Sequence, residues 1–252
     1  MHRFYLPPEE CQQPWLKLRG REAHHALHVL RLEPGDPVTV LDGVGHLYSC
    51  AVHRKEKDSL TLEVNQKEAR PALPCRFTLL VGIPKGKLIE DIIQKAVELG
   101  VHRVVPLVTE RVVSQFDTAG ASAKQDKWQQ VAVEAIKQCG GAWLPQVEPP
   151  QTITTALSRH ESSDLSFVGS LQTERRHPHE WIMEYEKKHG CRPQSASVWI
   201  GPEGDFTRAE LEAIITAGGK PCTLGELTLR VETAAIYCLS FLNYELRRPN
   251  AA

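Results

Sequence analysis

Two glycine-bearing segments in the last fifth of the 252-residue chain carry the residues best suited to bind a ligand. The first, Trp199 to Thr207, reads WIGPEGDFT and runs from a predicted strand end through a turn into a helix. Glycine lets the backbone approach a ligand closely, and ligands of open α/β sheets bind outside the carboxyl ends of the strands. An ordinary tight turn would also use two glycines, but Pro202 and Glu203 between them and the capped helix that follows favour a site.

The second segment, residues 224–235, reads LGELTLRVETAA and has the same order of strand end, loop and helix. Main-chain groups of Gly225 to Leu229 are free to recognise the edge of a flat heteroaromatic ring. Arg230 could bind a phosphate or form a plain surface ion pair, and Glu232 lies where the loop meets its helix. Three apolar side chains could form the walls of such a site: Leu224, Leu227 and Leu229.

A parallel sheet is predicted to position these segments. An apolar run over 77–83, helical spacing over 88–99 closed by Gly100, and a second apolar run over 101–108 together indicate a βαβ unit. Thr207 and Glu210 form a capping-box pattern at the start of a later helix. The same alternation predicts a helix or loop over 153–159, helices over 124–139, 180–188, 208–217 and 232–247, and strands over 165–169, 197–200 and 220–224.

The first 70 residues are predicted to form a separate, β-rich unit. Short apolar alternations over 37–41, 47–52 and 59–64 are separated by turns at 42–45 and 57–58. Residues 22–32 have helical spacing that stops before Pro34. A compact barrel with one helix fits this pattern, and the segment ARPALP at 69–74 is a stiff linker to the second domain.

Composition excludes several classes of protein. The formal net charge is −1, so there is no global excess of positive charge to indicate nucleic-acid binding, and a local patch would be needed. No segment has the apolar length of a membrane span, and the N-terminus lacks the apolar core of a signal peptide, so we expect a cytoplasmic protein. The seven scattered cysteines are predicted to be reduced, small buried side chains, and no metal site is proposed.

Taken together, the two glycine-bearing segments resemble the SPOUT class of RNA methyltransferases, and within it the 16S ribosomal RNA (uracil(1498)-N(3))-methyltransferase family. That family's pattern reads G-P-E-G-G-F-S and L-G-x-R-I-L-R-x-E-T-A, which residues 201–207 and 224–234 match here. The resemblance spans nearly the whole chain. Further matches are RF at 3–4, HVLR at 28–31 with GD at 35–36, DGVG at 42–45, KAVELGV at 95–101 and TER at 109–111.

The resemblance implies an α/β fold that residue spacing does not reveal. Residues 1–70 would form a PUA-like RNA-binding β-barrel, and residues 75–252 a SPOUT methyltransferase domain tied in a deep trefoil knot. It also implies a homodimer that binds S-adenosylmethionine and methylates N3 of a uridine in 16S ribosomal RNA of the small subunit. The implied cofactor-binding residues are Val168, Gly169, Ser170, Ile200, Gly201, Pro202, Glu203, Gly204, Leu224, Gly225, Leu227, Leu229 and Ala234.

Two residues are assigned to the chemistry and a larger group to RNA. Arg230 would neutralise negative charge that develops on the uracil carbonyls or grip a neighbouring phosphate, and Glu232 would orient Arg230 or accept the proton. His24 is an additional neighbour of the RNA-facing group. The residues predicted to bind RNA are Arg3, Arg19, Arg21, His25, His28, Arg31 and Arg111.

The sequence departs from the family pattern at three places. Asp205 stands where the family usually has a second glycine, and Leu227-Thr228 stands where it usually has Arg-Ile. Residues 137–141, KQCGG, replace E-Q-S-x-R, which removes another arginine. These changes leave open how the substrate is held.

Three alternatives remain open from the sequence. One is a SPOUT methyltransferase that acts on another ribosomal or transfer RNA base. Another is a non-catalytic RNA-binding or ribosome assembly factor that keeps the fold, which S-adenosylmethionine binding would exclude. A dinucleotide-dependent dehydrogenase is disfavoured because no G-x-G-x-x-G follows an early strand.

Overall fold

The computed structural model describes residues 2–11, 14–112, 120–159, 163–172 and 175–247. The chain divides into two compact units. The first contains Met1–Ala72 together with Val133–Leu144, and the second contains Leu73–Ala132 and Pro145–Ala252. The helix α3, Ala121–Cys139, therefore contributes its residues from Val133 onward to the first unit.

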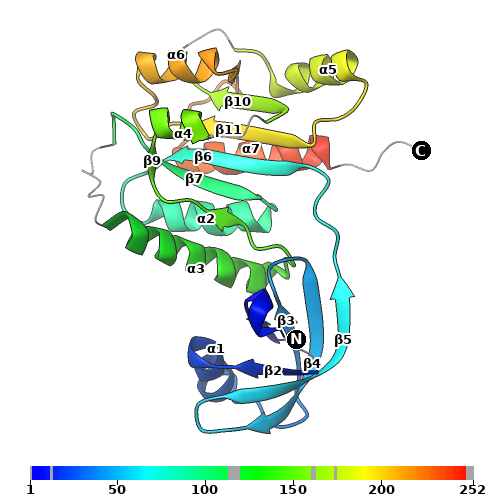
Figure 1. Ribbon diagram of the computed structural model, residues 1–252. Coiled ribbons are helices and arrows are strands. Elements are labelled where there is room, and N and C mark those ends of the chain that lie inside the picture. Colours follow the sequence, from blue (N-terminus) through cyan, green and yellow to red (C-terminus); the bar gives the residue numbers. More distant parts are fainter. Residues whose placement is uncertain (1, 12–13, 113–119, 160–162, 173–174, 248–252) are drawn as a thin grey trace. The chain divides into compact units, whose positions relative to one another are not determined.

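A curled five-stranded sheet forms the first unit (Figure 1). Its order is β1-β3-β4-β5-β2, and β1 runs parallel to β3 while the other pairings are antiparallel. Register shifts in β4 near Ser49 and Val52 bend the sheet, as bulges do. Because β1 and β2 are the ends of this order, the sheet is a half-barrel, where the alternation predicts a compact barrel. The strands are β1 His2–Tyr5, β2 Trp15–Leu18, β3 Pro37–Leu41, β4 His46–Lys55 and β5 Leu60–Ala69.

Short helices accompany this sheet. The helix predicted over 22–32 is found as α1, Gly20–His24, which continues as a π-helical turn, η2, His25–Val29. A 3-10 turn, η1, covers Pro8–Glu10. Arg31 then takes a left-handed φ of 53°, which ends the helical geometry before Pro34. Helix and sheet enclose an apolar core that includes Phe4, Leu16, Leu18, Ala26, Val40, Tyr48, Leu60 and Leu62.

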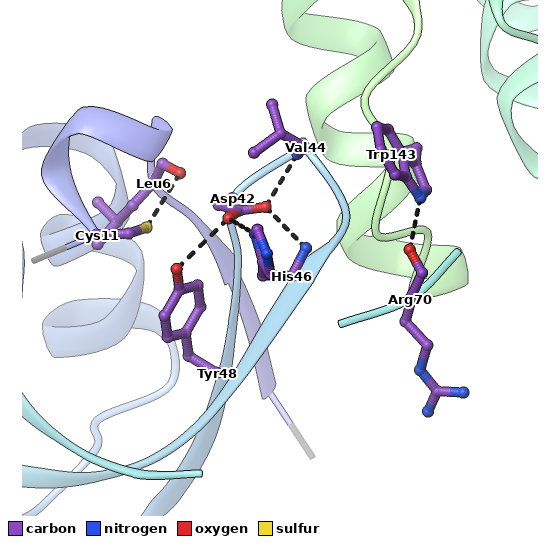
Figure 2. Close-up of polar contacts among 8 residues, drawn as sticks. All are labelled: Leu6, Cys11, Asp42, Val44, His46, Tyr48, Arg70 and Trp143. Carbon is purple, nitrogen blue, oxygen red and sulfur yellow. Dashed lines mark hydrogen bonds and ion pairs between the residues drawn. The ribbon is translucent and has the colours of Figure 1, made fainter. Parts of the chain in front are cut away.

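The turn between β3 and β4 is organised by a buried carboxylate, Asp42, which is 2% exposed (Figure 2). Its Oδ1 accepts hydrogen bonds from the backbone amides of Val44 at 2.9 Å and His46 at 3.0 Å. Its Oδ2 lies 2.7 Å from Nδ1 of the His46 ring and accepts a long hydrogen bond from the Tyr48 hydroxyl at 3.4 Å. This turn is therefore held by its own side chains, which explains the aspartate in the DGVG segment.

The same turn contacts residues 142–144, which are distant in the chain but belong to the first unit. The Gly45 amide donates to the carbonyl oxygen of Ala142 at 2.9 Å. The indole Nε1 of Trp143 donates to the carbonyl oxygen of Arg70 at 3.0 Å, as Figure 2 shows. Gly45 has a φ of 102°, and a Cβ at this position would lie 2.6 Å from an atom of the Trp143 ring. Glycine is required here by both the backbone angle and the close indole.

The second unit is built on a wholly parallel sheet in the order β12-β10-β11-β6-β7-β8, with β9 also pairing with β7 (Figure 1). This confirms the predicted parallel sheet, although the two-residue strands β8 and β9 were not predicted. The strands are β6 Arg76–Gly82, β7 Arg103–Val108, β8 Gln146–Val147, β9 Gln151–Thr152, β10 Leu165–Gly169, β11 Ser195–Ile200 and β12 Lys220–Cys222.

The described part of the second unit contains five further helices. Thr207 caps α6 through the predicted capping box, since its side chain accepts from the Glu210 amide and the Glu210 side chain accepts from the Thr207 amide. Gly100 follows α2 with a φ of 74°, as expected of a glycine that ends a helix. The helices are α2 Leu88–Glu98, α4 Ile153–Arg159, α5 Pro178–His189, α6 Arg208–Thr216 and α7 Val231–Leu246.

The cysteines divide into buried and exposed groups. The prediction of small buried side chains is right for Cys50, Cys75, Cys222 and Cys238, and Cys11 is half-buried. It is wrong for Cys139 and Cys191, which are exposed because they lie at or beyond the ends of α3 and α5. Among the described residues, no helix has both the length and the apolar character needed to cross a bilayer.

Candidate active site

The carboxyl ends of three neighbouring parallel strands meet at one edge of the second sheet. Gly169 at the end of β10 is in register with Ile200 at the end of β11 and with Cys222 at the end of β12. Because β10 lies between the other two strands, the loops that follow all three strands emerge side by side. The two glycine-bearing segments, which are more than 15 residues apart in the chain, are brought together in this way.

A cavity of about 440 Å³ lies among these loops. Most of the predicted cofactor-binding residues line it, as do Arg230 and Glu232. The residues that were predicted to bind the cofactor and that line the cavity are Gly169, Ser170, Ile200, Gly201, Pro202, Glu203, Leu224, Gly225, Leu227, Leu229 and Ala234. We call this cavity the donor pocket.

Two predicted cofactor-binding residues do not line the donor pocket. Val168 is fully buried and packs in the core of the second unit with Leu80 and Trp199, because neighbouring side chains of a strand face opposite sides of the sheet. Gly204 lies on the other side of its turn, where its carbonyl oxygen accepts a hydrogen bond from Nη1 of Arg111. Arg111 was predicted to bind RNA, and this contact uses part of its guanidinium to hold the turn.

Glycine is needed in the first loop for steric reasons. A Cβ on Gly201 would lie 2.9 Å from the backbone nitrogen of Phe206, and a Cβ on Gly82 would lie 2.5 Å from the nitrogen of Pro202. Real Cβ atoms do not approach backbone atoms this closely, so the strand end and the turn can touch only because both positions lack a side chain. In the second loop Gly225 has a φ of 109°, which a side chain would strain.

Asp205 occupies a left-handed backbone position, with a φ of 61°. The family pattern has glycine here, and the backbone angle gives the physical reason. Aspartate tolerates this region better than most residues because its short carboxylate can bond locally, and Oδ1 accepts from the Phe206 amide at 2.8 Å. Oδ2 accepts from Nε2 of Gln172 at 3.0 Å and lies 3.4 Å from the Ser170 hydroxyl. The carboxylate thus links two loops that line the donor pocket.

Glu203 holds the first loop against the segment before α2. One of its carboxylate oxygens accepts a hydrogen bond from the Lys85 amide at 2.9 Å. This contact supports a structural role for Glu203 in tying down a loop amide, although the side chain also lines the donor pocket.

The charged residues of the donor pocket come from the loops after β10 and β11 and from the start of α7. Arg230 is the exposed N-cap residue of α7, and its side chain makes no capping hydrogen bond. Glu232 is half-buried in the first turn of the same helix. Arg175, which the sequence did not indicate, also lines the pocket. Its Nη1 lies 3.4 Å from the carbonyl oxygen of Ser170. It follows β10 without any glycine motif, so no local signal marked it.

The residues of the first unit that were predicted to bind RNA have different surroundings. Arg3 donates to the carbonyl oxygens of Lys137 at 3.2 Å and Gln138 at 2.8 Å, near the end of α3. Arg21 forms an ion pair with Glu134 at 3.5 Å. His25 is half-buried with its ring edge against Phe4, whereas Arg19, His24, His28 and Arg31 are exposed.

Lys137, at one of the positions that depart from the family pattern, is 7% exposed and forms an ion pair with Glu22 at 2.7 Å. Glu22 also accepts from the Tyr5 amide at 3.2 Å. The departure at this position therefore serves the packing of the first unit, since a buried ammonium group needs such partners.

The donor pocket combines apolar walls, glycine-rich backbone and charges of both signs. Such a site can hold a flat heteroaromatic group on apolar side chains while polar groups fix its orientation. A family model described as an RNA methyltransferase domain matches residues 71–243, and one described as an RNA methyltransferase PUA domain matches residues 18–65. The fold and the site are thus those of an RNA methyltransferase.

Relatives that match nearly the whole chain identify the family within this class. The chain is 30% identical to ribosomal RNA small subunit methyltransferase E of Bacillus subtilis, over 97% of both chains. A Legionella pneumophila putative methyltransferase, solved with bound S-adenosylmethionine, is 28% identical with a TM-score of 0.86 over 96% of both chains. Ribosomal RNA small subunit methyltransferase E of Neisseria gonorrhoeae, also bound to S-adenosylmethionine, is 27% identical with a TM-score of 0.84 over 97% of both chains. The chain belongs to the ribosomal RNA small subunit methyltransferase E family.

Proposed function

We propose that this protein transfers a methyl group from S-adenosylmethionine to N3 of a uridine in 16S ribosomal RNA of the small subunit. The observation that carries the proposal is the donor pocket, which lies between the segments that match the family's two motifs. Membership of the family and the S-adenosylmethionine bound in two similar structures support the same cofactor here. We expect this reaction to take place in the cytoplasm.

The residues of the donor pocket fit this cofactor. Leu224, Leu227 and Leu229 offer apolar surface for an adenine ring, and the glycine backbone at Gly225 permits close approach to its edge. The carboxylates of Glu203 and Glu232 and the guanidinium of Arg175 offer opposite charges for an amino-acid moiety. S-adenosylmethionine supplies a methyl group on a sulfonium that leaves as a neutral thioether.

The protein's part in catalysis concerns the nucleophile. N3 of uracil is an imide nitrogen that carries a proton, which it must lose before or during attack. N3 is also hidden in any base pair, so the target base must be unpaired or flipped out. We assign to Arg230 the stabilisation of negative charge on the uracil carbonyls or contact with a neighbouring phosphate, because its exposed side chain lies at the pocket rim without a capping bond. Glu232, two residues on, orients Arg230 or accepts the proton.

RNA docking is assigned in part to the first unit. Residues 1–70 are proposed as the RNA-binding domain and residues 75–252 as the methyltransferase domain. Arg19, His28 and Arg31 are exposed and available for phosphates, while Arg3 and Arg21 have protein partners that reduce their contribution.

We further propose that the protein works as a homodimer and that its second unit contains the deep trefoil knot implied by the family resemblance. Large apolar and aromatic side chains at the donor pocket and on α7 support a partner surface: Leu227 is 79% exposed, Tyr237 46% and Tyr244 76%. Light scattering on the purified protein tests the dimer, which would show twice the 28.2 kDa chain mass.

The function is tested by incubating the purified protein with S-adenosylmethionine and small-subunit RNA, then mapping methylated nucleosides by mass spectrometry. We expect one new 3-methyluridine in 16S RNA. Methylation of another base would favour the alternative of a different target. Saturable cofactor binding excludes a binding-only factor, and its absence, together with no methyl transfer, would contradict the proposal.

A further inference from the structure

A second cavity of about 680 Å³ lies in the second unit, next to the donor pocket. Four separate parts of the chain form it: the segment before α2 with the start of that helix, the region after β7, the first half of α3, and the turn at 203–204. Glu203 lines both cavities, and the same turn gives Gly201 and Pro202 to the donor pocket and Gly204 to the second cavity. One turn of the chain therefore forms a wall shared by both sites.

The second cavity concentrates positive charge. Two carboxylates, Glu90 and Glu203, accompany five cationic side chains: Lys85, Lys87, Arg111, Lys124 and Lys127. The whole chain has a formal net charge of −1, so this excess is local. A concave site lined mainly by one sign of charge attracts the opposite charge strongly.

The cationic groups differ in their interactions with other parts of the protein. Lys127 forms an ion pair with Glu90, and Arg111 donates to the carbonyl oxygen of Gly204. Lys85 and Lys87 are exposed, and within the described ranges neither ammonium group pairs with a carboxylate. The backbone amide of Lys85 donates to the carboxylate of Glu203. These two lysines are the ones best placed to meet an anionic ligand.

We propose that the second cavity binds backbone phosphates of the RNA strand next to the target nucleotide, through Lys85 and Lys87. This inference rests on the proposed function. RNA is the anion that must lie beside the donor pocket while a base enters it, and phosphate contacts fix the register of a nucleic acid without reading its sequence. The shared turn at Glu203 couples the two sites: a strand anchored by the lysines presents its next nucleotide to the methyl donor.

The test compares the full-length protein with the double variant K85Q/K87Q. The affinity of the double variant for a small-subunit RNA fragment should be about tenfold lower than that of the unchanged protein. The slope of log affinity against log salt concentration should be shallower by about 1.4, the value for two phosphates of a single strand. Calorimetric affinity for S-adenosylmethionine should stay within about twofold, because neither lysine lines the donor pocket. The matched control is K187Q/K188Q, which removes two adjacent exposed charges from α5 and should leave all three quantities unchanged.

The outcomes separate this inference from the function on which it rests. If the unchanged protein methylates RNA and the lysine variant keeps its RNA affinity and salt slope, the second cavity does not bind the strand. An equal loss in K187Q/K188Q would also overturn the inference, since it would indicate a general charge effect. If the unchanged protein neither binds nor methylates RNA, the proposed function fails and the inference fails with it.

Discussion

Oδ2 of Asp205 accepts a hydrogen bond from Nε2 of Gln172 at 3.0 Å, and the same amide nitrogen donates to the carbonyl oxygen of Phe206 at 2.7 Å. The loop after β10 is thereby fastened to the loop after β11. Both loops line the donor pocket, so this pair fixes the distance between two of its walls. Asp205 lines the pocket and is a positioning residue, since its bond to Gln172 holds the loop after β10 in place.

We predict that Asp205→Gly weakens S-adenosylmethionine binding about tenfold, because the loss of a hydrogen bond to a charged acceptor frees the loop at 170–172. Glycine also relieves the left-handed backbone strain, so the free energy of unfolding should change by less than about 1 kcal/mol. Calorimetry and thermal unfolding measure the two effects. Asp205→Asn, which keeps Oδ1, should bind more tightly than the glycine variant. Unaltered cofactor affinity in Asp205→Gly would show that the link is dispensable.

Replacing Arg230 by alanine should separate chemistry from cofactor binding. We expect methyl transfer to fall by about 100-fold to 1,000-fold, as for the loss of one charge-stabilising donor, while the Kd for S-adenosylmethionine changes by less than about threefold. The helix should survive, because the Arg230 side chain makes no capping hydrogen bond. Single-turnover rates and calorimetry provide the measurements. Arg230→Lys should recover part of the rate if charge alone matters, and normal turnover in the alanine variant would exclude the proposed role.

Asp42→Ala should destabilise the first unit by about 3 kcal/mol, because the amides of Val44 and His46 lose a buried, charged acceptor. Hydrogen exchange of the β3 and β4 amides measures this loss in the unit concerned. Asp58→Ala, in an exposed bend, is the control and should change stability by less than about 0.5 kcal/mol. Equal protection in both variants would mean that the carboxylate does not hold the turn.

Alkylation of the native protein near pH 8 should modify Cys139 and Cys191 first. Only the thiolate reacts, and burial raises the pKa of the thiols of Cys50, Cys75 and Cys222 to about 12 and that of Cys238 well above its usual value. At pH 8 these groups hold their protons and are also shielded. Cys11, whose pKa is raised to about 12 by burial, should be slow as well. Intact-mass and peptide mapping give the order, and early modification of Cys222 would contradict the burial of this residue.

The sequence predicts the second unit well, because its apolar runs, helical spacing and caps are local signals. Thr207 with Glu210 and Gly100 act as their residue types suggest. The first unit is harder to predict. Strands β1 and β2 are four residues long, which is too short for a clear alternation, and the grouping of Val133–Leu144 with this unit depends on contacts distant in the chain.

For the site, glycines and motif residues could be found in advance, while side chains without a motif could not. Arg175 follows a strand in an unremarkable polar segment, and Leu88 begins a helix, yet both line the donor pocket. The position of Val168 outside the pocket lining has a simple cause. A three-residue strand end was assigned as a block, whereas alternate side chains of a strand face opposite sides of the sheet.

The most direct test of the account is a crystal structure of the protein with S-adenosylmethionine. We predict that the cofactor lies among the loops that begin at Ser170, Gly201 and Thr223, with its methyl group facing Arg230 and open to an incoming base. Cofactor bound at any place other than this edge of the sheet, or with its methyl group turned away from Arg230, would contradict the account.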